Sequence, residues 1–274
     1  MINKNISIII HTFNDEKNIV GCIKSANLLS DKVIAIDMES SDKTVDLTEK
    51  NGAVAYSFPK SNYVEPAREF GISKVDSNWV LILDSDERMT AELANEIKKV
   101  IDAGSHSGLS KIDSGVPRRG GVPRITPTHY KIPRKNIFGK VKWLKHGGWW
   151  PDYQIRLINK KYFRSWPKPI HSFPVISGNL GYLENPILHY FHGDLESMVG
   201  KTIVFEDIES DLLFKAQKNV NTLTFFRKFM GELYRRLIRN LGFLDGELGI
   251  IELIYQAFSK TITYIYLYEK GRSL

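Results

Sequence analysis

The sequence predicts an α/β protein whose mainly parallel sheet carries helices on both faces. Short, β-branched apolar runs alternate with segments of helical periodicity over the first hundred residues. Polar residues follow directly after several of these runs, at the strand ends where open α/β sheets bind their ligands. The pattern therefore predicts right-handed strand–helix–strand crossovers and a site at the carboxyl edge of the sheet.

The predicted elements alternate between strand and helix. The run Ile6-Ser7-Ile8-Ile9-Ile10 has the composition of a strand buried on both faces. Ile19, Ile23 and Ala26 then recur at helical spacing. Further strands are predicted at 33–36, 53–56 and 79–83, and further helices from a cap at Ser40, Ser41 or Asp42 to about 50, from about 63 to 75, and from a cap at Thr90 to about 103.

The second half of the chain reads differently. Residues 129–192 are rich in aromatic and turn residues, and the short runs at 129–132 and 154–158 predict strands of a mixed sheet. From about residue 197 the pattern is helical again. In 222–270, Glu252 and Lys260 interrupt the most apolar stretch, so no run reaches the roughly 18 to 20 apolar residues of a membrane-spanning helix. These C-terminal amphipathic helices either lie in a membrane interface or cap the core.

Composition and charge limit the class of protein. The chain is 42% hydrophobic and 25% charged, as in ordinary soluble proteins. The chain has one cysteine, Cys22, which excludes an internal disulfide framework and is expected in the core. The N-terminus lacks the apolar segment of a signal peptide, so we expect a cytoplasmic protein. Residues 111–168 hold 15 Lys and Arg against 2 Asp and Glu, hence +13. This block indicates an anionic partner, although residues 104–124 read as a solvated loop.

The acidic pair in Asp84-Ser85-Asp86 follows the apolar run 79–83. Carboxylate oxygens suit Mg²⁺ or Mn²⁺, and a metal held by one or two carboxylates keeps positions for substrate phosphates. The loops after the first, second and fourth strands should meet at one crevice, which has no glycine-rich phosphate-binding turn. Phosphate must then be held by metal and by basic side chains such as Arg68.

Four segments along this edge have a specific order and spacing. They are Thr12-Phe13-Asn14-Asp15-Glu16, Asp37 through Thr44, Ala67-Arg68-Glu69-Phe70-Gly71 and Asp84-Ser85-Asp86-Glu87. Together they resemble the nucleotide-sugar-dependent glycosyltransferases of family 2, which have the Rossmann-like GT-A fold. Phe13 and Asp15 stand where the family commonly has Tyr and Glu, and Met38-Glu39 replaces small residues.

Four later segments extend the resemblance to a bacterial subgroup that includes lipopolysaccharide core β-glucosyltransferases. They are Trp150 through Leu157, Ile170-His171, Leu188-His189-Tyr190 and Gly242 through Gly249. We expect a catalytic domain at 1–219 and a C-terminal helical region at 220–274, which either associates with a membrane or caps the core. The expected catalytic domain consists of a nucleotide-sugar-binding half at 1–103, a loop at 104–128 and an acceptor half at 129–219.

The resemblance also implies roles for individual residues. Asp37 would accept a hydrogen bond from a uracil ring nitrogen, Asp86 would bind Mn²⁺ or Mg²⁺, and Asp84 would contact ribose or a metal-bound water. His189 matches a third metal ligand found in some GT-A enzymes. The complete set expected to contact the donor is Thr12, Asn14, Glu16, Asp37, Arg68, Asp84, Ser85 and Asp86.

The acceptor side needs a base, for which Asp152 is the candidate. It is one of two acids in the basic block, and it matches an Asp-x-Gln-x-x-Arg-like pattern; an ion pair with Arg156 or a turn after Pro151 would explain it equally. The residues expected to position acceptor or diphosphate are Gln154, Arg156, His171, Trp149 and Trp150. The two tryptophans follow flexible glycines, as in a loop that closes over sugar, but they could also be core residues.

Together these features predict an inverting glycosyltransferase that moves a sugar, expected to be a hexose linked to UDP, onto an anionic glycolipid, lipopolysaccharide-core-type or oligosaccharide acceptor. We expect it at the inner face of the cytoplasmic membrane as a peripheral protein with no nucleic-acid partner. A metal-dependent nucleotidyltransferase would show a glycine-rich basic loop after the first strand. A non-catalytic module that binds membranes or anionic polymers would explain the basic block but not the convergent acids.

Overall fold

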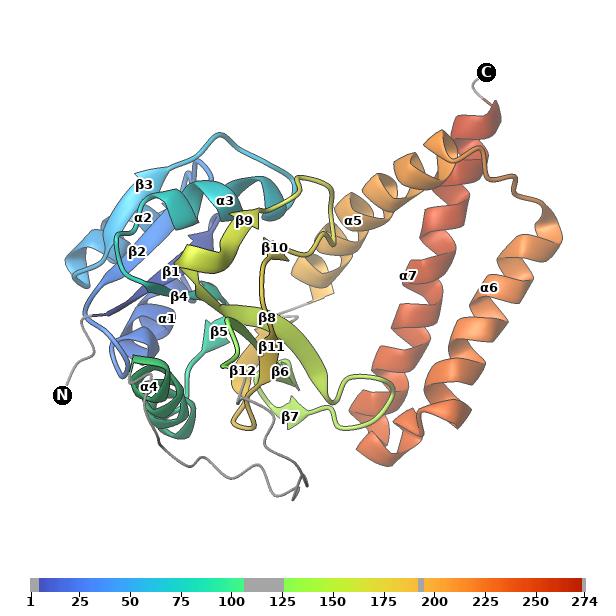
Figure 1. Cartoon of the computed structure of the whole chain (residues 1–274). Coiled ribbons are helices and arrows are strands. Elements are labelled where there is room, and N and C mark those ends of the chain that lie inside the picture. The colour runs from blue at the N-terminus through green and yellow to red at the C-terminus, as the bar shows by residue number, and fades with distance from the viewer. Residues whose placement is uncertain (1–4, 106–125, 192–194, 273–274) are drawn as a thin grey trace. The chain divides into compact units, whose positions relative to one another are not determined.

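The computed structural model describes residues 5–105, 126–191 and 195–272 (Figure 1). By compactness the chain divides into two units. The first unit comprises residues 1–133 and 153–188, and the second comprises 134–152 and 189–274. The predicted boundary at 219/220 lies inside the second unit. The functional division of the chain at that boundary stays a prediction. Most of the predicted loop 104–128 lies outside the described residues.

The first unit is built on parallel strands, as the alternation predicts. β1 pairs in parallel with β2 and with β4, and β2 pairs in parallel with β3. The order of hydrogen-bonded strands is β3-β2-β1-β4-β8-β6-β12-β5, with β11 and β7 also paired to β6. The bounds of the first four strands are β1 Ile6–Thr12, β2 Val33–Asp37, β3 Val54–Ser57 and β4 Trp79–Asp84.

The later strands make the sheet mixed. β8 runs antiparallel to β4, β7 runs antiparallel to β6, and β11 runs parallel to β6. β9 and β10 form a separate antiparallel pair. The bounds are β5 Glu87–Arg88, β6 His129–Phe138, β7 Lys142–Trp143, β8 Asp152–Asn159, β9 Phe163–Ser165, β10 Val175–Ile176, β11 Leu180–Tyr182 and β12 Ile187–Phe191.

Helices cover both faces of the parallel strands because the side chains of a strand alternate between faces. Ile8 and Ile10 pack with α1 and α4, whereas Ile9 packs with α3 on the opposite face (Figure 1). Cys22 of α1 belongs to the first of these clusters and is fully buried, as expected. The helices are α1 Ile19–Ala26, α2 Thr44–Lys50, α3 Glu65–Ser73 and α4 Ala91–Ser105.

The starts of α2 and α4 differ in their capping. The N-cap of α2 is Lys43, whose side chain makes no capping bond, so the predicted cap at Ser40, Ser41 or Asp42 was wrong, although Asp42 accepts from the backbone N of Thr44 at 2.9 Å. At the start of α4, Thr90 accepts from the backbone N of Leu93 at 3.1 Å, as predicted. Each of these two bonds satisfies an amide that has no partner within the helix.

The second unit is dominated by helices, drawn in orange and red in Figure 1. α7 packs against both α5 and α6. None of the helices, over the ranges that the structure describes, combines the length and apolar character needed to cross a membrane. The elements are α5 Leu195–Lys215, α6 Thr222–Tyr234, the π-helical turn η2 Arg235–Arg239, the 3-10 turn η3 Gly242–Asp245 and α7 Gly246–Arg272.

Candidate active site

The carboxyl ends of three parallel strands lie in register. Thr12 of β1 is the partner of Asp37 in β2, and His11 is the partner of Asp84 in β4. The predicted convergence of polar residues at this edge is therefore present. Asp84 is the last residue of β4, so its carboxylate is attached to a strand fixed on both sides.

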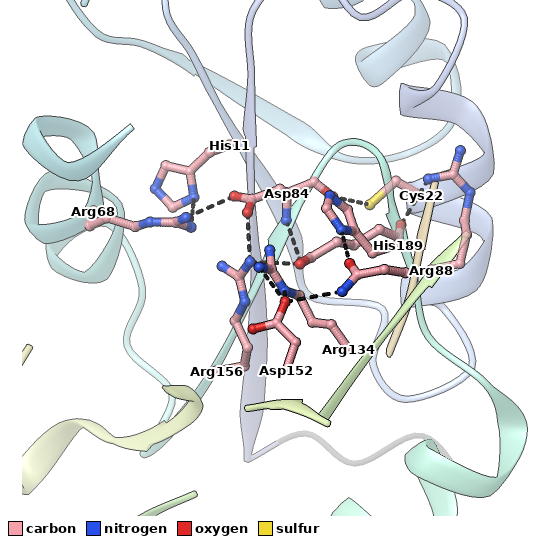
Figure 2. Close-up of polar contacts among 11 residues, drawn as sticks. His11, Cys22, Arg68, Asp84, Arg88, Arg134, Asp152, Arg156 and His189 are labelled. Carbon is pink, nitrogen blue, oxygen red and sulfur yellow. Dashed lines mark hydrogen bonds and ion pairs between the residues drawn. The ribbon is translucent and has the colours of Figure 1, made fainter. Parts of the chain in front are cut away.

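Asp84 sits in a buried charge network (Figure 2). Arg68 of α3 donates from Nη2 to its Oδ1 at 2.8 Å, and Arg156 of β8 donates from Nη2 to its Oδ2 at 2.6 Å. Arg156 also donates to Oε1 of the fully buried Glu87 at 2.6 Å. The two arginine side chains are only 7% and 5% exposed. Both oxygens of Asp84 are thus held by fixed cations, and Arg156 joins this network.

The network sets the ionisation of its members. Burial alone would raise the pKa of Asp84, but Arg156 and Arg68 hold that pKa well below its usual value. His11, whose Nδ1 lies 3.1 Å from Nη1 of Arg68, has its pKa lowered well below 6.5 by burial and by Arg68. His11 is therefore neutral and accepts from Arg68, while Asp84 is an anion.

A second cluster joins the loops after β1 and β2. Ser40 donates from Oγ to Oδ1 of Asp37 at 2.6 Å and accepts from the backbone N of Asn14 at 2.8 Å. The Asn14 side chain accepts from the backbone N of Ser41 at 2.8 Å, and Asn14 adopts a left-handed φ of +49°, which Asn tolerates better than most residues. The structure thus brings Asn14 and Asp37 together through Ser40.

Other predicted donor contacts lie at the same edge. Glu16 is exposed and accepts from the backbone N of Lys43 at 3.2 Å. The hydroxyl of Thr12 is buried and has no hydrogen-bond partner among the described residues. Ser85 donates to the carboxylate of Asp15, and Arg88 donates to the carbonyl of Ser85 at 2.7 Å. These bonds tie down the turn that carries Asp86.

The predicted base Asp152 belongs to the second unit and begins β8. Its ion pair is made with Arg134 of β6, at 2.6 Å from Nη2 to Oδ2. Asn136 donates from Nδ2 to the same oxygen at 3.3 Å, and its Oδ1 lies 2.6 Å from Nδ1 of His189 (Figure 2). Asn136 therefore links the candidate base to the candidate metal ligand.

The aromatic loop before Asp152 is anchored to the C-terminal helices of the same unit. Asp245 of η3 accepts from the backbone N of Lys145 at 2.8 Å and of His146 at 2.7 Å. Its other oxygen lies 2.9 Å from Nδ1 of His146. A Cβ at Gly242 would lie 3.2 Å from Cα of Gly147, so the two segments approach closely. The loop is thus held by a turn about 100 residues further along the chain.

The two tryptophans of this loop, Trp149 and Trp150, are half-buried, and each packs against another aromatic ring. Trp149 packs on Phe191 with ring centroids 4.8 Å apart, and the guanidinium of Arg236 lies 5.3 Å from its ring. Trp150 packs edge-on against Trp143 at 5.3 Å. Neither is a fully buried core residue, so both stay candidates for the sugar-closing role.

The remaining predicted residues divide between the units. Gln154 and Arg156 alternate with Asp152 along β8, so the three belong to one face of that strand. His171 is exposed in the first unit and donates its backbone N to Glu65 at 2.8 Å. His189 lies inside β12 and belongs to the second unit.

Sequence reasoning missed several residues of these clusters. Arg134 and Asn136 occupy alternate positions of β6, which was the one available signal that they share a face. Glu87 and Asp245 stood inside segments that carried the family resemblance, but no role was assigned to either. Their contacts come from residues distant in sequence, so they become visible only in the folded chain.

Comparison with known proteins identifies the family. Residues 7–167, more than half of the chain, match the sequence model described as "Glycosyl transferase family 2". The chain belongs to this family. It is therefore a glycosyltransferase with a GT-A fold, and the prediction of family and fold class is confirmed.

Several relatives share nearly the full length of this family 2 enzyme. The protein named "Uncharacterized glycosyltransferase RP128" of Rickettsia prowazekii is 36% identical over 267 residues, which cover 94% of this chain and 84% of the relative. That named "Uncharacterized glycosyltransferase RC0292" of Rickettsia conorii is 24% identical over 280 residues, or 98% and 92% of the two chains. Among solved structures, residues 1–349 of S. aureus TarS in complex with UDP-GlcNAc match with a TM-score of 0.47 and 14% identity over 98% and 92% of the chains.

Proposed function

We propose that this family 2 enzyme is an inverting glycosyltransferase that moves a hexose from a UDP-linked donor to a glycolipid or oligosaccharide acceptor of the lipopolysaccharide-core type. The observation that carries the proposal is the set of charged and polar groups at the ends of β1, β2 and β4. These groups are held by one another before any substrate arrives, which is the preorganisation that catalysis by fixed charges requires.

In this proposal the nucleoside binds at the β1 and β2 edge. The carboxylate of Asp37 is fixed by the hydroxyl of Ser40, at 2.6 Å, and by the backbone N of Ser40, at 2.9 Å. A ring N–H of uracil would find this acceptor already oriented. The buried hydroxyl of Thr12 is a further group that a nucleotide could satisfy, because buried polar groups seldom stay without a partner.

In this proposal Asp84 and Asp86 have different roles. Both carboxylate oxygens of Asp84 are bound by arginines, so we assign Asp84 to positioning and Asp86 to the metal. No group of three or more His, Cys, Asp or Glu side chains placed for a metal ion is found within 5–105, 126–191 and 195–272. A single carboxylate with diphosphate oxygens is a common arrangement for Mg²⁺ and Mn²⁺.

His189 fits the metal by its chemistry. Its Nδ1 lies 2.6 Å from Oδ1 of Asn136, and metal-binding histidines commonly have one ring nitrogen beside an oxygen acceptor in this way. When bound, Mn²⁺ or Mg²⁺ would neutralise the charge that grows on the leaving diphosphate.

Asp152 acts as the base in the proposed reaction. Its carboxylate takes the proton from the acceptor hydroxyl, the hydroxyl oxygen attacks the anomeric carbon, and the bond to UDP breaks on the opposite side, which inverts the configuration. Arg134 and Asn136 hold Oδ2 of Asp152 and so orient its carboxylate for the proposed proton transfer. Gln154 and Arg156 of β8 orient acceptor and diphosphate.

The acceptor is assigned by charge. The block 111–168 carries 15 Lys and Arg against 2 Asp and Glu, which suits phosphorylated or acidic glycolipids.

A screen of nucleotide sugars, read by UDP release and product mass, tests the proposal. We expect release from one or a few UDP-hexoses with divalent metal, and its loss in Asp86→Asn. Pyrophosphate release from a nucleoside triphosphate would indicate a nucleotidyltransferase, and no turnover at all would favour a binding module.

A further inference from the structure

The outward face of α7 is apolar along most of its length. Between residues 250 and 268, every residue of α7 that is classed as exposed is Ile, Phe or Tyr. They are Ile250, Ile251, Ile254, Phe258, Ile265 and Tyr268, each 41% to 53% exposed. At 1.5 Å per residue this row extends over about 27 Å. Solvent-facing helices of soluble proteins show polar residues there, so this face needs a partner.

The inward face of the same helix, in contrast, is tied to α5 by polar groups. Tyr255 lies 2.6 Å from the hydroxyl of Thr202, and Ser259 donates to Glu206 at 2.8 Å. Near the C-terminal end, Lys270 donates to Asp207 at 2.7 Å and to Asp211 at 2.6 Å. The helices thus satisfy polar groups with one another and turn large apolar side chains outward.

α6 and the turn after it add a second apolar row with positive charge beside it. Four side chains of α6 recur at helical spacing and are exposed, namely Leu223, Phe226, Met230 and Tyr234. The segment 222–241 holds 5 Arg and Lys against 1 acid, hence +4. That acid, Glu232, is bound by Arg235 and Arg236.

We propose that α6, α7 and the turn between them dock on the surface of an anionic lipid bilayer. The exposed apolar rows would enter the boundary between headgroups and acyl chains, about 5–10 Å deep, while exposed arginines such as Arg227 and Arg239 contact lipid phosphates. The positive charge of 222–241 selects an anionic bilayer over an uncharged partner. This inference does not depend on the donor or the base proposed above.

Vesicle sedimentation of the full chain tests this surface. We expect the chain to bind vesicles in which about a third of the lipid is phosphatidylglycerol, and to bind phosphatidylcholine vesicles at least about tenfold more weakly. Ile254→Glu combined with Phe258→Glu should lower the partition coefficient at least about tenfold. Val54→Glu is the matched control, because Val54 of β3 is 54% exposed and Phe258 is 53% exposed. Phe226→Ser with Met230→Ser provides a second pair should the first fail to fold.

Two further readouts separate the alternatives. UDP release from the donor in detergent-free buffer should be unchanged in these variants, so a loss of vesicle binding cannot be confused with a loss of catalysis. Sedimentation velocity without lipid should give a monomer. A dimer that dissociates in Ile254→Glu/Phe258→Glu would show that a second copy covers this face, and would overturn the proposal. Equal vesicle binding by these variants and by the wild type would overturn it too.

Discussion

Asp84 in the first unit and Asp152 in the second are both paired with arginine, but in different ways. Two arginines that are 5% and 7% exposed hold the two oxygens of Asp84. Arg134, which is 20% exposed, pairs with Oδ2 of Asp152. The two carboxylates are similarly exposed, at 26% and 23%, but the arginines of Asp84 are less accessible to water than Arg134. We therefore propose that Asp84 belongs to a permanent framework, whereas Asp152 exchanges its arginine for an acceptor hydroxyl during the reaction.

The largest expected effect is on turnover. Asp152→Asn should lower kcat by about 10² to 10⁴-fold, the usual contribution of a general base, and leave the affinity for UDP unchanged. Steady-state transfer kinetics and a UDP titration measure the two quantities. Turnover within threefold of the wild type would remove Asp152 from the mechanism.

Removing an arginine from each pair tests the structural side of the comparison. Arg156→Met leaves Asp84 and Glu87 without their shared buried cation and should lower the free energy of unfolding by about 3–5 kcal/mol. The matched variant Arg134→Met, from the more exposed pair, should cost only about 0–1 kcal/mol. Urea unfolding measures both. Equal losses would mean that the two pairs are not different in kind.

A smaller effect is expected from the anchor of the aromatic loop. Asp245→Ala removes the acceptor of the amides of Lys145 and His146 and should cost about 1–3 kcal/mol. Because the loop carries Trp149 and Trp150, KM for the acceptor should rise more than KM for the donor. Asp245→Asn, which keeps an acceptor oxygen, should restore much of the loss. Equal changes in both KM values would argue against a role in positioning the acceptor side.

The smallest effect concerns pH. The folded pKa of His11 lies well below 6.5, so the unfolded chain binds more protons at this site as the pH falls. The stability from neutral His11 is full above about pH 6.5 and falls below it, by at most about 1.4 kcal/mol per pH unit. His11→Gln should flatten the unfolding profile between pH 6.5 and 5. An unchanged slope in His11→Gln would contradict this.

The sequence was a good guide where local pattern determines structure. β1 contains four isoleucines in its first five residues, and α1 repeats its apolar residues every three or four positions, so both were predictable. The edge that holds Thr12, Asp37 and Asp84 was predictable too, since parallel strands end on the same side.

The partners of the charged groups were not predictable. Asp152 pairs with Arg134, 18 residues away, because β6 and β8 bring the two side chains together, and Arg156 turns to Asp84 instead. Which arginine meets which acid depends on strand register, and a shift by one residue would send each side chain to the other face. The same holds for Asp245 and the loop it anchors.

Calorimetric titration with UDP in the presence of Mn²⁺ tests most directly whether Asp86 binds the metal and donor while Asp152 acts only on the acceptor. We expect UDP to bind the wild type in a metal-dependent way, to bind Asp152→Asn equally well, and to bind Asp86→Asn at least about tenfold more weakly. Binding of UDP that is independent of metal, or unchanged in Asp86→Asn, would contradict it.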